Sequence, residues 1–172
     1  MKRHVLMQLL YDQGASLPLY VGGVDGFPPP SVGALELPSN APLKLGDAVV
    51  ALVEDNWILA EIQAALPGGK FDIKDVDDEQ KTRVTVSRAC LIPLPKFRAD
   101  PQRDGHALFP RDAIVLALYP QTTCFYRGII QRPPEAPTDT YMITFEDSSY
   151  ANGFSPALPI HQRYVVGYRD AP

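Results

Sequence analysis

Along the first residues of the chain, apolar side chains recur at the spacing of a helix. Those at positions 5, 6, 9 and 10 fall on neighbouring turns, so residues 3–12 predict a short amphipathic helix. Residues 14–42 are rich in proline and glycine, and we expect an extended connector there without a core of its own. The pattern leaves open whether the helix docks on the following domain or on a partner.

From residue 44 onward, apolar and β-branched residues gather in short runs separated by turn signals. Five such runs cover residues 49–53, 57–62, 71–73, 83–87 and 91–94, and Pro67-Gly68-Gly69 is a turn signal between the second and the third. Strands of about five residues at this spacing are typical of a small β-barrel. We therefore expect a first barrel in this part of the chain.

The same pattern of runs then occurs a second time. Residues 112–118, 125–130, 141–147 and 162–166 repeat, in order, the character of four runs of the first set. Two copies of one small barrel, joined by residues 95–110, are the simplest explanation. We predict a mainly β protein with a helix and Pro/Gly-rich connector over residues 1–43, a first barrel over 44–107 and a second barrel over 108–172.

The composition agrees with a loop-rich β protein and narrows the choice of partner. The 172 residues include 18 prolines and 12 glycines, which favour turns over long helices. The formal net charge is −4 and the lysines and arginines form no cluster, so we expect no direct contact with nucleic acid. Acidic residues gather over residues 72–79, which suits a cationic partner; a solvated acidic loop is the alternative.

Residue patterns needed for catalysis, metal binding or membrane insertion do not occur in the sequence. Cys90 and Cys124 have no CxxC spacing, and His4, His106 and His161 have no metal-ligand spacing. There is no GxSxG motif or phosphate-binding glycine loop, no signal-peptide pattern, and no apolar run near the ~18 residues that span a bilayer. We expect no enzyme activity, metal, cofactor or membrane association, and a reducing compartment, either cytosol or nucleus.

Comparison of the two copies singles out three aromatic residues of the second copy. Tyr119, Tyr126 and Phe145 each fall opposite a non-aromatic residue of the first copy. Alternation along a strand turns Tyr126 outward if its predecessor points into the core, and it puts Phe145 and Asp147 on one face. Aromatic faces beside a carboxylate bind methylated ammonium ions. If the rings converge, they predict a methyl-lysine site; taken singly, each is as well explained as a half-buried strand aromatic.

Two acidic residues of the first copy form a second candidate site. Asp75 and Asp77 are two residues apart, so both carboxylates face the same way in an extended segment. This arrangement suits a protonated amine, which has three donors. An EF-hand calcium loop would need glycine and glutamate where the chain has Gln80 and Val86, so that reading fails. An exposed acidic turn without a ligand is the alternative.

Several segments resemble a known family. From about residue 46 to 168, the chain is similar to the C-terminal tandem Tudor region of the SAGA-associated factor 29 family. The most distinctive matching segments are VLALYPQTTCFYR at 115–127, FEDSSY at 145–150 and QRYVV at 162–166, with shorter ones at 57–61, 75–77, 90–95 and 107–109. The resemblance implies two SH3-like Tudor barrels packed face to face.

The resemblance also implies a ligand, the N-terminal tail of histone H3 with a di- or trimethylated lysine at its fourth residue. The family's cage positions fall on Tyr119, Tyr126 and Phe145, with Asp147 beside them. A second pocket, which holds the free amino group of the first tail residue, would follow from the family's pattern.

By the same resemblance, Asp75 and Asp77 would hold that amino group, and Gln121 and Thr123 would contact the tail backbone. The implied context is a nuclear subunit of a SAGA-type histone acetyltransferase complex that acts in transcription regulation. Residues 1–42 lie outside the resemblance. Two alternatives stay open: a Tudor reader of another methylated lysine or arginine ligand, and a plain protein-interaction scaffold.

Overall fold

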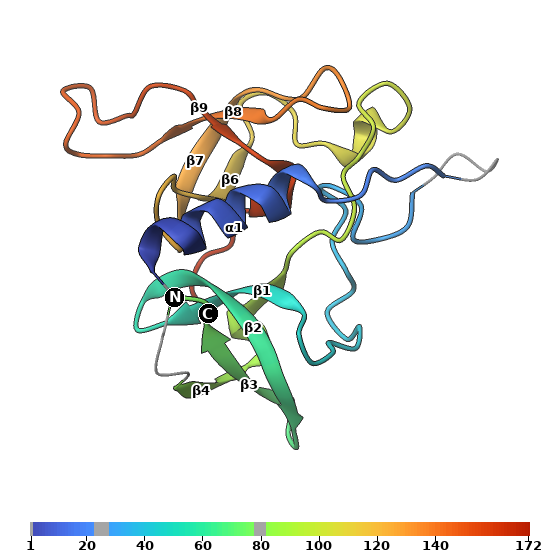
Figure 1. The fold of residues 1–172 in the computed structure, drawn as a ribbon, viewed down its shortest axis with the longest axis vertical. Helices are drawn as coiled ribbons and strands as arrows, with labels where there is room; N and C mark the ends of the chain where they lie inside the picture. Colours follow the sequence, from blue (N-terminus) through green and yellow to red (C-terminus); the bar gives the residue numbers. More distant parts are fainter. Residues whose placement is uncertain (1, 23–27, 78–81) are drawn as a thin grey trace.

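One helix and ten strands make up the fold of this computed structural model, which describes residues 2–22, 28–77 and 82–172 (Figure 1). Helix α1 covers Arg3–Ala15. The first group of strands is β1 (Ala48–Val53), β2 (Asn56–Leu66), β3 (Lys70–Asp75), β4 (Arg83–Ser87) and β5 (Leu91–Pro93). The second group is β6 (Ile114–Leu118), β7 (Cys124–Arg132), β8 (Tyr141–Phe145), β9 (Leu158–Ile160) and β10 (Val165–Gly167). Three 3₁₀ turns, η1 (Arg88–Cys90), η2 (Gly105–Ala107) and η3 (Gln162–Tyr164), complete the list.

The predicted runs agree with the observed elements apart from one strand and one turn. The sequence pattern did not predict strand β9, because β9 has only three residues and contains Pro159. Proline removes a ladder donor and is confined to edge strands, and β9 indeed pairs only with β8. The predicted run 162–166 divides into the turn η3 and strand β10, just as η1 precedes β5 in the first copy.

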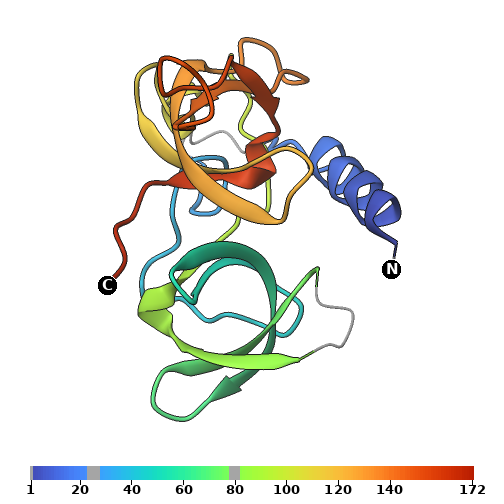
Figure 2. The ribbon, with the colours of Figure 1, turned by 90° about the vertical axis from the view of Figure 1, so that its left-hand side faces the viewer.

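Each group of strands curls into a barrel, and Figure 2 shows the two barrels one above the other. The bending strand of each barrel carries an irregularity at the equivalent place: between Ile62 and Ala64 in β2, and between Ile130 and Arg132 in β7. Such bulges bend a strand and raise its twist, which lets one strand take part in two sides of a small barrel. The mainly β, tandem-barrel architecture predicted from the repeat is confirmed.

The two barrels share one sheet and part of one core. β2 pairs with β7 through Trp57–Phe125 and Ile58–Cys124, so a continuous ladder crosses from the first barrel to the second. Along β2, alternate side chains serve different cores. Ala60 lies in the core of the first barrel, whereas Leu59 lies in the larger cluster that also contains the core of the second barrel. This sharing fixes how the barrels sit against each other.

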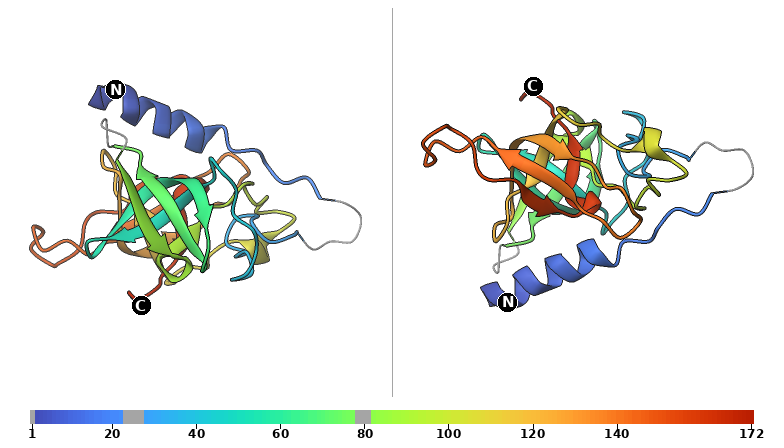
Figure 3. Two further views of the ribbon diagram at one scale, coloured as in Figure 1. Left: turned by 90° about the horizontal axis from the view of Figure 1, so that it is seen from below. Right: turned by 90° about the horizontal axis from the view of Figure 1, so that it is seen from above.

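Helix α1 packs on the second barrel, which the sequence had left open (Figure 3). Leu6 and Leu10 are buried in the cluster of the second barrel, and the Tyr164 hydroxyl donates to the Leu10 carbonyl at 2.6 Å. A Cβ at Gly14 would lie 2.9 Å from ring atoms of both His161 and Tyr164, so glycine permits the close approach. In the described ranges, no helix has the length and apolar character needed to cross a membrane.

The connector contributes to a small core, contrary to the expectation that it would have none. Val32 is fully buried with Ala99 and Ala107 of the segment that joins the barrels. Next to them, the buried side-chain amide of Gln162 exchanges two hydrogen bonds with the backbone of Ala99, at 2.8 and 3.0 Å. Long-range packing of this kind leaves no local pattern, because its partners are far apart in the sequence.

Candidate functional site

Two tyrosine rings meet at an open pocket on the second barrel. Tyr119 directly follows β6 and Tyr126 lies in β7; their ring centroids are 5.8 Å apart with the planes at 85°. Tyr126 is 46% exposed, so its ring is accessible to a ligand. The pocket has a volume of about 410 Å³ and is lined by Tyr119, Thr122, Tyr126, Glu146, Asp147 and Ser148. Three of the four predicted cage residues therefore line one pocket.

The fourth predicted cage residue, Phe145, lies behind the pocket. Its ring centroid is 4.9 Å from that of Tyr119, but the residue has 0% exposure. Its partner across the β7–β8 ladder is Gly128, and a Cβ added there would lie 3.5 Å from the Phe145 ring, in ordinary contact with it. In this structure Phe145 thus supports the Tyr119 ring and is not itself a wall of the pocket.

The carboxylate of Asp147 keeps the pocket negative. The Ser149 hydroxyl and backbone N–H donate to Asp147 Oδ1 at 2.6 and 2.9 Å, and the Tyr119 hydroxyl donates to Oδ2 at 3.3 Å. The bonds from Ser149 lower the pKa of Asp147, so the group is ionised at neutral pH. Burial and Asp147 raise the pKa of Tyr119, which stays a neutral donor. A second carboxylate on the rim, Glu146, pairs with Arg127 Nε at 3.3 Å.

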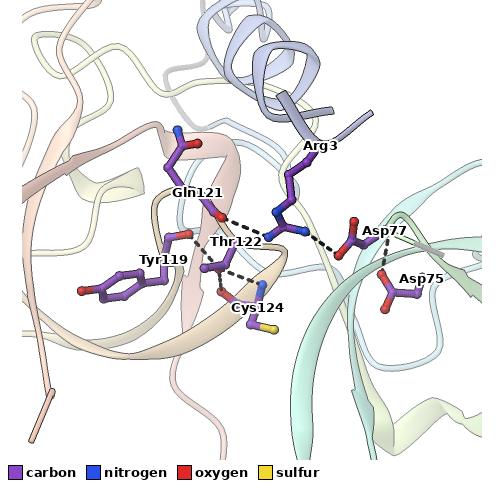
Figure 4. A network of polar contacts seen from close by, with 7 residues as sticks. All are labelled: Arg3, Asp75, Asp77, Tyr119, Gln121, Thr122 and Cys124. Atoms are coloured by element: carbon purple, nitrogen blue, oxygen red, sulfur yellow. Dashed lines mark hydrogen bonds and ion pairs between the residues drawn. The ribbon is translucent and has the colours of Figure 1, made fainter. Parts of the chain in front are cut away.

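On the first barrel, the turn after β3 carries the other candidate site. Asp75 is the last residue of β3, and its Oδ1 accepts a hydrogen bond from the backbone N–H of Asp77 at 2.9 Å. Asp77 is exposed, and its Oδ2 accepts a 2.7 Å bond from Nη1 of Arg3 on α1 (Figure 4). The other acids of this stretch, Asp78 and Glu79, lie outside the described residues. The structure thus brings a cation to the predicted amine site.

The loop between β6 and β7 lies between the two sites. Gln121 has a left-handed backbone with φ of 64°, and its carbonyl accepts a bond from Arg3 Nη2 at 3.0 Å. The Thr122 hydroxyl donates to the Tyr119 carbonyl at 2.8 Å and accepts from the Cys124 backbone N–H at 3.1 Å. These bonds hold the loop in a tight turn that presents the Gln121 carbonyl toward the first barrel.

Thr123, the other predicted contact for a tail backbone, is buried and is not among the residues that line the pocket. It is 5% exposed, and its carbonyl accepts a 2.8 Å bond from the backbone N–H of Leu59 in β2. The neighbouring Thr122, which the sequence did not single out, lines the pocket in its place. A one-residue difference of this kind depends on the loop conformation and not on strand alternation.

The two sites lie along one edge of β2. β1 occupies the other edge, so β3 and β7 pair with successive parts of the same edge of β2. β3 ends at the pair Ala60–Asp75, and β7 begins at the pair Ile58–Cys124. Along β2, the positions opposite Asp75 and Tyr126 are four residues apart. This spacing corresponds to about 14 Å at ~3.4 Å per residue. A hydrogen-bonded strand therefore fixes the separation of the two sites.

The sites also occupy equivalent positions in the two copies. Asp75 pairs with Ala60 at the end of β3, and Phe145 pairs with Gly128 at the end of β8. The alignment of the repeats inferred from sequence is thus the alignment that the ladders give. One copy has acids at these positions, and the other has aromatic residues with one acid.

Between the two sites lies the thiol of Cys124, whose pKa is raised by burial and by the nearby carboxylate of Asp75. A raised pKa makes this thiol a poor nucleophile at neutral pH. Within residues 2–22, 28–77 and 82–172, no three His, Cys, Asp or Glu side chains come together as ligands for a metal ion.

Comparison with known proteins identifies the family. The family model described as the SGF29 tudor-like domain matches residues 46–169, which include both barrels and both candidate sites. The chain belongs to this family. Membership confirms the resemblance found in the sequence, and the Tudor-like fold agrees with the two barrels.

Relatives extend this result beyond the barrels. A Drosophila melanogaster protein named SAGA-associated factor 29kDa is 47% identical over 174 residues, covering 98% of this chain and 60% of the fly protein. The Arabidopsis thaliana SAGA-associated factor 29 homolog B is 34% identical over 98 residues, covering 54% of this chain and 34% of the plant protein. The chain therefore spans at most about 60% of the length of these relatives.

Among solved structures, the Arabidopsis thaliana AGDP1 AGD34 structure matches 74% of this chain and 83% of its own with a TM-score of 0.43 and 14% identity.

Arg3, like Thr122, belongs to the site region but was not singled out from the sequence. It lies 74 positions from Asp77 and 118 from Gln121, yet it bonds to both. The position of Arg3 follows from the docking of α1 on the second barrel, and no local sequence pattern predicts that docking. The only signal near it was the helical spacing of the apolar residues that follow.

Proposed function

We propose that this chain is a non-catalytic reader of the histone H3 N-terminal tail, with di- or trimethylated lysine at the fourth tail residue as the recognised mark. The observation that carries the proposal is the open pocket where the rings of Tyr119 and Tyr126 meet beside the ionised carboxylate of Asp147. A methylated ammonium is a large, weakly hydrated cation that is attracted by aromatic faces and by a carboxylate. A neutral apolar side chain would gain no electrostatic attraction from the Asp147 carboxylate.

The acidic turn supplies the second half of the recognition. Asp75 and Asp77 offer carboxylate acceptors to the free amino group at the start of the tail, and the Gln121 carbonyl offers a backbone acceptor on the way to the pocket. Charge-assisted hydrogen bonds to an ammonium are the stronger class of hydrogen bonds. A ligand without a free N-terminus would lose them.

The separation of the two sites agrees with this register. An extended chain covers about 10 Å between its first and fourth residues, and the four-carbon stem of lysine adds reach toward the pocket. The spacing between Asp75 and Tyr126 along β2 is about 14 Å. A methyl mark only one residue from the N-terminus would fall short of the tyrosines while the amine remained bound.

The role in the cell follows from the relatives and belongs to the same proposal. The fly relative is named as SAGA-associated, and we infer that this chain acts in the nucleus as part of a SAGA-type histone acetyltransferase complex. Two-point binding would hold that complex at chromatin bearing the mark. We expect an affinity in the micromolar range, about −7 to −8 kcal/mol, because an extended tail must be ordered on binding.

Calorimetry with four tail peptides tests the proposal: unmodified, trimethylated, N-acetylated, and both trimethylated and N-acetylated. The trimethylated peptide with a free amine should bind most tightly. Tyr126→Ala should remove the preference for methylation, and Asp77→Asn should weaken free-amine peptides regardless of methylation. Acetylated and free peptides that bind the wild type equally would point to a Tudor reader of another methylated ligand. The absence of binding to every peptide would leave only a scaffold role.

A further inference from the structure

The contact of Arg3 with both halves of the site has a consequence for ligand binding. The guanidinium donates to the Asp77 carboxylate at 2.7 Å and to the Gln121 carbonyl at 3.0 Å, so it bridges the acidic turn of the first barrel and the loop of the second (Figure 4). Both acceptors are the groups that the proposed function assigns to the ligand's ammonium and backbone. A guanidinium and an ammonium compete for the same oxygens, because both are cationic donors without acceptor capacity.

The helix holds Arg3 in this position before any ligand arrives. Leu6 lies one turn further along the same face as Arg3 and is buried on the second barrel together with Leu10. The bond from Tyr164 to the Leu10 carbonyl and the close approach at Gly14 fix the rest of the helix. Only the Arg3 side chain must therefore be ordered for the contact to form, which makes an intramolecular competitor effective.

The contact is weak enough to be displaced. The side chains of Arg3 and Asp77 are 52% and 39% exposed, and exposed ion pairs of this kind favour the closed state over the open one by no more than about fivefold. The apparent affinity of a ligand falls by the fraction of molecules that are open. If the closed state is between about one and about five times as populated as the open state, binding is weakened by about 2- to 6-fold.

We propose that Arg3 is a built-in competitor for the cationic end of the ligand, so that α1 restrains the reader site until the tail displaces the guanidinium from Asp77 and Gln121. This inference rests on the proposed function. It also links helix and site: whatever moves the first turn of α1 away from the barrels removes the guanidinium from the acidic turn, and ligand binding frees the Arg3 side chain.

The test compares Arg3→Ala with Lys2→Ala in the full chain. Lys2 is a matched control because it is the adjacent exposed cation, and its ammonium makes no hydrogen bond or ion pair with a described residue. Both substitutions remove one positive charge, so a general attraction for a cationic tail changes equally in both. Calorimetry with the free-amine trimethylated tail peptide should show Arg3→Ala binding about 2- to 6-fold more tightly than Lys2→Ala.

One further measurement sharpens the result. In an Asp77→Asn background, Arg3→Ala should bring a smaller gain than in the wild type, since the guanidinium then competes with the ligand only at the Gln121 carbonyl.

Arg3→Ala binding equal to or weaker than Lys2→Ala, with a wild type that binds the peptide, would overturn this inference and leave the proposed function standing. A wild type and an Arg3→Ala variant that both fail to bind any tail peptide would overturn the proposed function, and this inference with it. Unchanged far-ultraviolet circular dichroism in all variants establishes that folding is not the cause.

Discussion

Replacing Tyr126 with leucine separates binding by an aromatic face from binding by apolar contact alone. Leucine retains much of the apolar surface but has no π-system. The attraction of a cation for one aromatic face is about 0.5–1 kcal/mol at an exposed site and ~2 kcal/mol when desolvated. Tyr126 is 46% exposed, so the lower range applies. We expect Tyr126→Leu to weaken trimethyl-lysine binding by about 2- to 5-fold through this contribution.

The decisive assay uses a second peptide in which a neutral carbon replaces the nitrogen of the trimethylammonium group. The two groups have the same shape, and only one is charged. The wild type should prefer the charged peptide, and Tyr126→Leu should lose about 2- to 5-fold of that preference while binding the neutral peptide nearly as before. Tyr126→Phe retains a ring and should keep the preference. Calorimetry at fixed ionic strength measures all six affinities.

The reasoning would be refuted if Tyr126→Leu weakened both peptides equally, since the ring would then supply only surface. It would also be refuted if the wild type bound the neutral peptide as well as the charged one. In that case the pocket would be an apolar site, and Asp147 would have no part in selecting a cation.

Three other predictions concern the framework of the site. Gln162→Ala leaves the buried backbone N–H and C=O of Ala99 without their 2.8 and 3.0 Å hydrogen bonds, so the free energy of unfolding in urea should fall by about 2–5 kcal/mol. The exposed control Gln102→Ala should change the free energy of unfolding by less than about 0.5 kcal/mol. Gly128→Ala would place a Cβ 2.6 Å from the Ile143 Cγ2 methyl, which should destabilise the fold by about 1–3 kcal/mol and weaken tail binding; wild-type stability would contradict the tight fit. Hydrogen bonds lower the pKa of Asp147, so this carboxylate stays ionised as the pH falls. Affinity for an N-acetylated trimethylated peptide should therefore be constant from pH 7.5 to about 5, and Asp147→Asn should lower the affinity over that whole range. A decline of the wild-type affinity within that range would contradict this prediction.

Strand positions and their repetition were predictable from the sequence because both depend on short-range patterns. Alternation placed Tyr126 outward and its predecessor inward, and the structure has the first exposed and Phe125 buried. The repeat located the positions where the copies diverge, and the ladders pair Asp75 and Phe145 at equivalent places. The same comparison predicted that the chemistry differs between the two barrels.

The tertiary structure decided which of those residues meet and which are accessible. Phe145 is the clearest case: alternation puts it on the face of Asp147, yet it is fully buried behind the Tyr119 ring. Thr123 likewise turns its carbonyl to β2, and Thr122 takes its place at the pocket. Neither outcome follows from the spacing of residues within one strand.

By itself, then, the sequence determined the strands, the duplication and the chemical character of two sites, because hydrophobic periodicity and turn residues act over a few neighbouring positions. Only the folded chain decided that the sites lie along one edge of β2 and that Arg3 of α1 reaches Asp77. Those contacts join residues far apart in the sequence, and their geometry depends on how two barrels and a helix pack around a shared core. Packing of that kind is a property of the whole fold and has no period along the chain.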